Sequence, residues 1–217
     1  QSVPPLDVSV ILISQAAEAL YYAHRHKVYH CDIKPSNLMV TQQGNIKVID
    51  FGIAKERAFE NENTDATMGF EGTYHYAAPE QFGDNRTQIG PATDVYALGA
   101  TLFQLFTNRK PFEGMTYEER LQAAGELPAK TPRELNTKIP RAFSDMVMKA
   151  VAPDPRDRFS SAMDFANALK EEKSGAGELR REVKLEDRSF NKVPRWLWGI
   201  FGLVLFCLII LFAEIKN

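Results

Sequence analysis

An acid, a lysine and an amide stand within eight residues of one another in the segment 30–37, which reads HCDIKPSN. Asp32, Lys34 and Asn37 are a combination that a surface loop has no need of for solubility alone. Asp50 follows thirteen positions after Asn37 and opens the tripeptide Asp50-Phe51-Gly52. The side chains of Asn37 and Asp50 are hard oxygen ligands of the kind that suits Mg²⁺. The spacing therefore indicates a site for charged, metal-assisted chemistry.

The segment between these groups predicts a structure that brings them together. Residues 38–40 and 46–49 are short runs rich in strand-forming side chains, separated by a Gly-containing turn, and they predict a β-hairpin. Because a hairpin brings its two ends together, we expect Asp32, Asn37 and Asp50 to converge in space.

The surrounding sequence predicts a mainly helical domain. Apolar residues recur at helical spacing over residues 8–26, behind Asp7 as the expected N-cap. This helix is apolar over much of its surface, so we expect it to lie inside the domain. Proline-containing breaks separate further predicted helices, at residues 95–107, 117–124, 140–152 and 161–170. The stretch 53–72 is polar and without a period, which is typical of a functional or mobile connection.

Composition narrows the classes of function. The chain has 217 residues and a formal net charge of −2, so no overall field favours nucleic acid as a partner. Cys31 and Cys207 are the two cysteines and lie in very different contexts. They do not form a disulfide framework, which fits a reducing compartment.

The C-terminal region is of a different kind. Residues 196–213 contain no charged side chain, and as a helix they reach about 27 Å, close to the thickness of a hydrocarbon core. Trp196 and Trp198 stand at one end, where indole rings favour the membrane interface. A buried core helix is the alternative, but such a helix normally shows a polar stripe. We expect one transmembrane helix at 196–213, a charged linker at 171–195 and a short tail at 214–217.

Charge on either side of this segment predicts its orientation. One lysine follows the segment, whereas several basic residues precede it: Lys184, Arg188, Lys192 and Arg195. The positive-inside rule then places residues 1–170 in the cytoplasm. The expectation is a single-pass membrane protein, with the lipid bilayer as a partner.

Taken together and in order, the motifs resemble the C-terminal lobe of a eukaryotic-type protein kinase. The motifs are His30-Cys31-Asp32 with Lys34 and Asn37, then Asp50-Phe51-Gly52, then Ala78-Pro79-Glu80. The resemblance runs from about residue 6 to residue 169, and the Pro-Glu-Gln ending with a single anchor is similar to bacterial membrane Ser/Thr kinases. It implies a kinase C-lobe over residues 1–170, a helical bundle with a small hairpin at the catalytic site. It also implies that the membrane is a bacterial inner or plasma membrane.

The resemblance implies a role for each residue of the site. Asp32 is the expected catalytic base for the substrate hydroxyl, and Lys34 is expected to contact the γ-phosphate of ATP, which favours Ser/Thr acceptors. Met39 is the expected floor of the adenine pocket. Asn37 and Asp50 are expected to hold Mg²⁺, with Mn²⁺ as an alternative.

Other residues have expected supporting roles. His30 and Phe51 would stack in the hydrophobic column that joins the two lobes of a kinase, with Gly52 completing their motif. Asp94 is expected to be buried at a helix start and to hold the backbone of the catalytic loop. A final pair, Glu80 and Arg158, is expected to tie the activation segment to the lobe.

One departure from the pattern bears on the activation segment. Thr73 is the threonine expected to bridge to Asp32 and Lys34, and Thr64 and Thr67 are candidate phosphorylation sites. Cys31, however, stands where the family usually has an arginine that binds activation-loop phosphate. Because a thiol cannot make a bidentate, charge-assisted contact, we expect activity to depend only weakly on loop phosphorylation.

A second departure concerns the nucleotide. Residues 1–217 contain no Gly-rich phosphate loop, no strand lysine with its helix glutamate and no hinge, which in this family belong to the N-lobe. We expect a membrane-anchored kinase that phosphorylates Ser/Thr residues of proteins, of which these 217 residues alone are inactive. The alternatives are a membrane-tethered pseudokinase or scaffold and, less in keeping with the Ala-Pro-Glu motif, a small-molecule phosphotransferase. A homodimer is left open.

Overall fold

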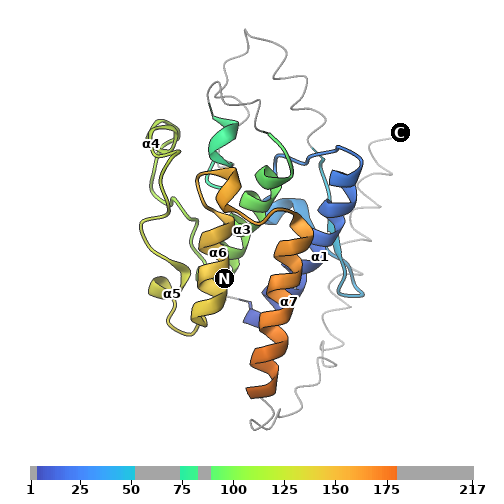
Figure 1. Cartoon of the computed structure of the whole chain (residues 1–217). Coiled ribbons are helices and arrows are strands. Elements are labelled where there is room, and N and C mark those ends of the chain that lie inside the picture. Colours follow the sequence, from blue (N-terminus) through green and yellow to red (C-terminus); the bar gives the residue numbers. More distant parts are fainter. Residues whose placement is uncertain (1–3, 52–73, 83–88, 180–217) are drawn as a thin grey trace, which may run out of the picture. The chain divides into compact units, whose positions relative to one another are not determined.

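The computed structural model describes residues 4–51, 74–82 and 89–179 (Figure 1). The chain divides into two compact units, residues 1–179 and 180–217, and the described residues all belong to the first. Within these ranges no helix is both long enough and apolar enough to cross a bilayer. The expected transmembrane segment at 196–213 lies outside the described residues, as do the tail and the linker from residue 180 onwards.

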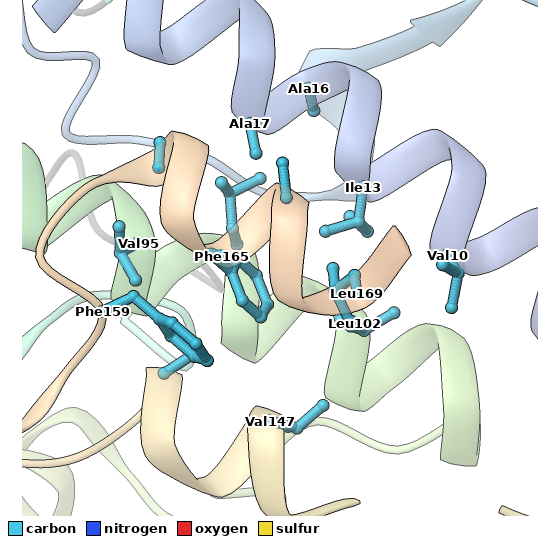
Figure 2. Packing of buried hydrophobic residues seen from close by; sticks show 14 of the residues in the cluster. Val10, Ile13, Ala16, Ala17, Val95, Leu102, Val147, Phe159, Phe165 and Leu169 are labelled. Carbon is cyan, nitrogen blue, oxygen red and sulfur yellow. The ribbon is translucent and has the colours of Figure 1, made fainter. Parts of the chain in front are cut away.

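Three long helices form the centre of the unit: α1 (Leu6–Arg25), α3 (Pro91–Thr107) and α7 (Ala162–Leu179). α1 packs against both α7 and α3, as Figures 1 and 2 show. The apolar side chains between them are fully or almost fully buried: Val10, Ile13, Ala16, Ala17, Leu20, Val95, Leu98, Leu102, Phe165 and Leu169. Burying each large side chain of this kind contributes about 1.5–3 kcal/mol, so the three helices form a rigid base for the loops at their ends.

The remaining helices surround this base. α6 (Arg141–Ala150) packs against α3 and α7, while α4 (Tyr117–Gln122) and the short α5 (Pro132–Leu135) lie in the connection between α3 and α6. Both short helices begin with a capping box, in which a threonine side chain accepts a bond from the backbone of a glutamate three residues on. The described residues also form three 3₁₀ turns: η1 (Pro35–Asn37), η2 (Pro79–Gln81) and η4 (Pro155–Asp157).

The predicted hairpin is confirmed. β1 (Leu38–Val40) pairs antiparallel with β2 (Ile46–Val48), and Met39 lies opposite Lys47. Gly44 has a φ of 79° in the connecting turn, a conformation that glycine adopts without steric cost. The side chain of Gln15 accepts a bond from the backbone N–H of Ile46 at 2.8 Å, which fastens the hairpin to α1.

The mainly helical fold with one small hairpin is as expected, but three local predictions were wrong. α1 begins at Leu6 with Pro5 at the cap position, so Asp7 lies inside the first turn and does not cap the helix. The helix expected to end near residue 170 continues to residue 179, because strong helix formers outweigh the two glycines there. α5 stands in a stretch taken for a break, since a proline suits the first position of a helix.

Candidate active site

Residues 30–37 form the expected catalytic loop. The backbone of this catalytic loop is held by one buried carboxylate, that of Asp94 in the first turn of α3. Its oxygens accept bonds from the backbone N–H groups of His30 and Cys31, each at 2.8 Å. The Nε2 group of His24, at the end of α1, donates a third bond at 2.8 Å. Asp94 has 0% exposure, so these three donors offset the free-energy cost of burying its carboxylate. The loop is thereby fixed to α3 and, through His24, to α1.

His30 links the catalytic loop to the segment around Asp50. Its Nε2 donates to the carbonyl of Ile49 at 2.9 Å, and its Nδ1 accepts a bond from the backbone N–H of Asp32 at 3.2 Å. One donating and one accepting nitrogen define a neutral imidazole. Its ring also contacts that of Phe51, with ring centroids 4.7 Å apart. Residues on both sides of Asp50 are therefore attached to His30.

The side chains of Asp32, Lys34 and Asn37 lie together in the loop. Lys34 Nζ is 3.1 Å from Asp32 Oδ2. Asn37 Nδ2 donates to the backbone carbonyl of Asp32 at 2.8 Å and lies 3.4 Å from its Oδ2. Asn37 is positioned by η1, which starts at Pro35, and it is buried. The carboxylate of Asp32 is thus held between a cation and an amide.

The segment that leads to Asp50 is bonded to this cluster through its backbone. The backbone N–H of Ile49 donates to the carbonyl of Asn37 at 3.0 Å, which brings the start of the Asp50 segment to the loop. Asp50 is exposed and has a φ of 57°. Because the amide nitrogen of Asn37 is engaged by Asp32, its Oδ1 is the atom left for a ligand, apart from a long 3.4 Å contact with the Ser36 hydroxyl. Asn37 and Asp50 would suit Mg²⁺, which takes oxygen ligands.

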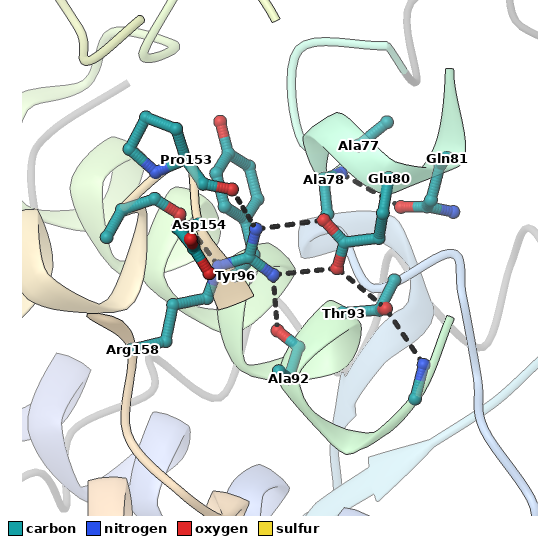
Figure 3. A network of polar contacts seen from close by, with 12 residues as sticks. Ala77, Ala78, Glu80, Gln81, Ala92, Thr93, Tyr96, Pro153, Asp154 and Arg158 are labelled. Carbon is teal, nitrogen blue, oxygen red and sulfur yellow. Dashed lines mark hydrogen bonds and ion pairs between the residues drawn. The ribbon is translucent and has the colours of Figure 1, made fainter. Parts of the chain in front are cut away.

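A buried ion pair anchors the segment that follows (Figure 3). Arg158 makes a bidentate contact with Glu80, at 2.7 and 2.8 Å, and the Thr93 hydroxyl donates to the same carboxylate at 2.8 Å. Arg158 also donates to three backbone carbonyls, those of Ala92, Ala152 and Pro153. Both side chains are essentially unexposed, and breaking such a pair by removing one partner costs about 3–5 kcal/mol. η2 is therefore fixed to the start of α3.

Comparison with known proteins shows which family the chain belongs to. A family model described as a protein kinase domain matches residues 6–172, which is most of the chain. The chain belongs to the protein kinase family. It is 33% identical over 190 residues to a probable serine/threonine-protein kinase of Clostridium perfringens, covering 87% of this chain and 27% of that protein. It is 37% identical over 165 residues to the serine/threonine-protein kinase PrkC of Bacillus subtilis, covering 73% of this chain and 24% of PrkC.

One similar kinase carries a different name. The tyrosine-protein kinase MasK of Myxococcus xanthus is 36% identical over 188 residues, covering 81% of this chain and 28% of MasK. The chain spans about a quarter of the length of these relatives. The activity and substrates of the intact kinase are therefore matters for proposal.

Sequence reasoning missed several residues that support the kinase site. Nothing in the sequence indicates that His24, at the end of α1, donates to Asp94. Arg120 follows two glutamates on a short helix, with no sign of burial in the sequence, but it has 0% exposure and lies over the ring of Phe112 at 3.9 Å. Burial lowers the pKa of its guanidinium, which donates to the hydroxyl of Tyr96 at 2.8 Å. Long-range contacts of this kind leave no local pattern.

Other expected residues are placed less tightly or fall elsewhere. Met39 is 54% exposed on β1, so among the described residues nothing encloses it as the floor of a pocket. Four residues singled out from the sequence lie outside the described residues: Gly52, Thr64, Thr67 and Thr73. Within the part of the chain that the structure describes, no three His, Cys, Asp or Glu side chains gather into a metal-binding group.

Proposed function

We propose that this chain is the catalytic-lobe part of a kinase that transfers the γ-phosphate of ATP to Ser or Thr hydroxyls of protein substrates. The observation that carries the proposal is the position of the Asp32 carboxylate, 3.1 Å from Lys34 Nζ and 3.4 Å from Asn37 Nδ2. The loop that holds it is bonded to the buried carboxylate of Asp94. A scaffold that signals by binding alone has no need of this set.

Each residue has a chemical task in this proposal. Asp32 accepts the proton of the substrate hydroxyl, and its contact with Lys34 orients the carboxylate. The Lys34 ammonium would also contact the transferred phosphate. Asn37 and Asp50 would hold Mg²⁺, which when bound neutralises charge on the phosphates. The protein contributes alignment and electrostatics, which is what phosphoryl transfer requires.

The proposal extends to the cell membrane. The uncharged segment 196–213 anchors the kinase, and the basic residues before it keep residues 1–170 in the cytoplasm, where ATP is available. Residues 1–217 hold none of the N-lobe phosphate-binding motifs, so we expect this piece to be inactive by itself. Phosphorylation by residues 1–217 alone would contradict that expectation.

The test is a phosphorylation assay on the intact protein with radiolabelled ATP, Mg²⁺ and a general acceptor protein. We expect incorporation into Ser and Thr, and a loss of kcat of about 100-fold or more in the Asp32→Asn variant, since a positioned base contributes 10²–10⁴-fold. Asp145→Asn, which changes an exposed aspartate on α6, is the matched control and should retain wild-type activity. No phosphorylation by the wild-type protein would favour the pseudokinase. Label on tyrosine alone would replace the Ser/Thr assignment.

A further inference from the structure

Gln81 is a buried residue of η2 whose side-chain amide is bonded at both ends. Its Oε1 accepts the backbone N–H of Ala78 at 2.9 Å, and its Nε2 donates to the backbone carbonyl of Cys31 at 2.8 Å. The amide therefore joins the activation-segment end, residues 74–82, to the catalytic loop fifty positions earlier. We propose that Gln81 is a positioning residue for phosphoryl transfer, which rests on the kinase activity proposed above.

The catalytic-loop end of this bridge lies directly before the expected base. The carbonyl of Cys31 and the N–H of Asp32 belong to one peptide group, and that N–H donates to His30 Nδ1 at 3.2 Å. On the other side of residue 31, its own N–H donates to Asp94 Oδ1 at 2.8 Å. With Gln81 in place, both peptide groups around Cys31 are held, and the direction in which the Asp32 side chain leaves the backbone is set.

The other end of the bridge lies in a segment that is itself firmly anchored. The N–H of Ala78 shares a peptide group with the carbonyl of Ala77, which accepts a bond from the buried Arg120 at 3.2 Å. The neighbouring Glu80 is locked by Arg158. Gln81 therefore bonds to one anchored peptide group in each of the two segments. A small hollow lined in part by Asp32, Tyr76 and Gln81 lies beside the bridge.

The chemistry at this position requires a donor and an acceptor at the same time. An amide supplies both, whereas an ionised carboxylate supplies only acceptors and would face the Cys31 carbonyl with a like partial charge. A methionine of similar length supplies neither. A displacement of about 1 Å at a reacting group can cost about 100-fold in rate, so losing the bridge should reduce turnover more than binding. Because Cys31 cannot bind a phosphate through its side chain, these backbone contacts carry the alignment of the loop.

The experiment uses the intact protein and the variants Gln81→Glu and Gln81→Met. Gln81→Glu keeps the acceptor for Ala78 and loses the donor to Cys31, and Gln81→Met removes both bonds without adding a buried charge. The matched control is Asn136→Asp, since Asn136 Nδ2 donates to the Phe106 carbonyl at 3.0 Å and its Oδ1 accepts the backbone N–H of Lys138. This control loses the same kind of bond at a distant position, between α5 and α3. The measurements are kcat, the KM for ATP and for the acceptor protein, and the folded fraction by circular dichroism at the assay temperature.

We expect kcat per folded molecule to fall about 10- to 100-fold in both Gln81 variants with the KM for ATP unchanged, whereas Asn136→Asp lowers the melting temperature and leaves kcat unchanged. A purely structural role would reduce the folded fraction in all three variants without changing kcat per folded molecule. Wild-type kcat in either folded Gln81 variant would overturn the inference. An inactive wild-type protein would instead count against the proposed function, so the two failures are distinguishable.

Discussion

At the scale of single residues, the site depends on polar groups that are paired where they are buried. Asp94 accepts three bonds, and Glu80 accepts two from Arg158 and one from Thr93. Cys31 stands between these groups with a φ of 60°, and its backbone, not its side chain, makes the contacts described here. The thiol of Cys31, in place of the arginine expected there, bears on regulation.

Because residue 31 is a cysteine and not an arginine, we expect activity to depend only weakly on phosphorylation of the activation loop. The double variant Thr64→Ala/Thr67→Ala removes both candidate acceptors of the loop. Because a thiol at residue 31 cannot form a charge-assisted contact with a phosphate, we expect kcat to fall by less than about tenfold, which is 1.4 kcal/mol in the barrier. The measurement is the initial rate of the intact protein, with the exposed Thr137→Ala as the control. Near-total loss of activity in the double variant would contradict the prediction.

His75 provides a prediction for pH. Burial, reinforced by the positive charge of Lys110, lowers the pKa of His75 from 6.5 to about 4. Between these values the unfolded chain binds a proton that the folded chain does not, so the contribution of His75 to stability is complete above pH 6.5 and is lost as the pH falls towards 4. We expect the urea midpoint of His75→Gln to change less between pH 7 and pH 4.5 than that of the wild type. The exposed His26→Gln is the control, and parallel curves for His75→Gln and wild type would refute the assignment.

At the scale of elements, α3 is the helix to which the site is attached. Its first turn carries Thr93 and Asp94, which bond to the activation-segment end and to the catalytic loop. Its other faces pack against α1, α6 and α7, which explains why the helix carries apolar residues on most of its surface. A shift of α3 would therefore move both parts of the site at once.

The contact between α3 and α6 depends on a glycine. A Cβ atom added at Gly99 would lie 2.6 Å from the Cβ of Ala150 and 3.1 Å from Cγ1 of Val151. Gly99→Ala should destabilise the protein by about 1–3 kcal/mol through overpacking, which exceeds the gain in helix propensity of about 1 kcal/mol. The check is urea denaturation, with Gly125→Ala as the control because an added Cβ there meets nothing within 4 Å. Equal stability of Gly99→Ala and wild type would show that the helices can separate at little cost.

At the scale of the whole molecule, the sequence predicts what depends on local pattern. The spacing of apolar residues in α1 and the hairpin that leads to Asp50 are both local and both confirmed. The bridge from Gln81 to Cys31 spans fifty positions, and the burial of Arg120 depends on aromatic rings from other segments. These contacts form only once the helices have packed, so no local pattern in the sequence predicts them. The extra length of α7 was missed for a different reason, since two glycines suggested an end that the neighbouring residues override.

The proposed membrane anchor gives the prediction that concerns the chain as a whole. Truncation after Arg195 removes the uncharged segment 196–213, which as a helix would span about 27 Å of hydrocarbon. We expect the truncated protein to move from the carbonate-resistant membrane pellet to the soluble fraction, with its kcat unchanged because the kinase match ends at residue 172.

A full-length variant with Val204→Arg and Leu208→Arg is the companion test for this anchor. Each arginine at the centre of a spanning helix opposes insertion by about 2.5–3.5 kcal/mol, so this variant should also leave the pellet. Its length and linker are those of the wild type, which separates loss of the apolar segment from loss of the C-terminus itself. Retention of both variants in the pellet would assign membrane binding to residues before 196 and overturn the anchor, and a wild-type protein found in the soluble fraction would do the same.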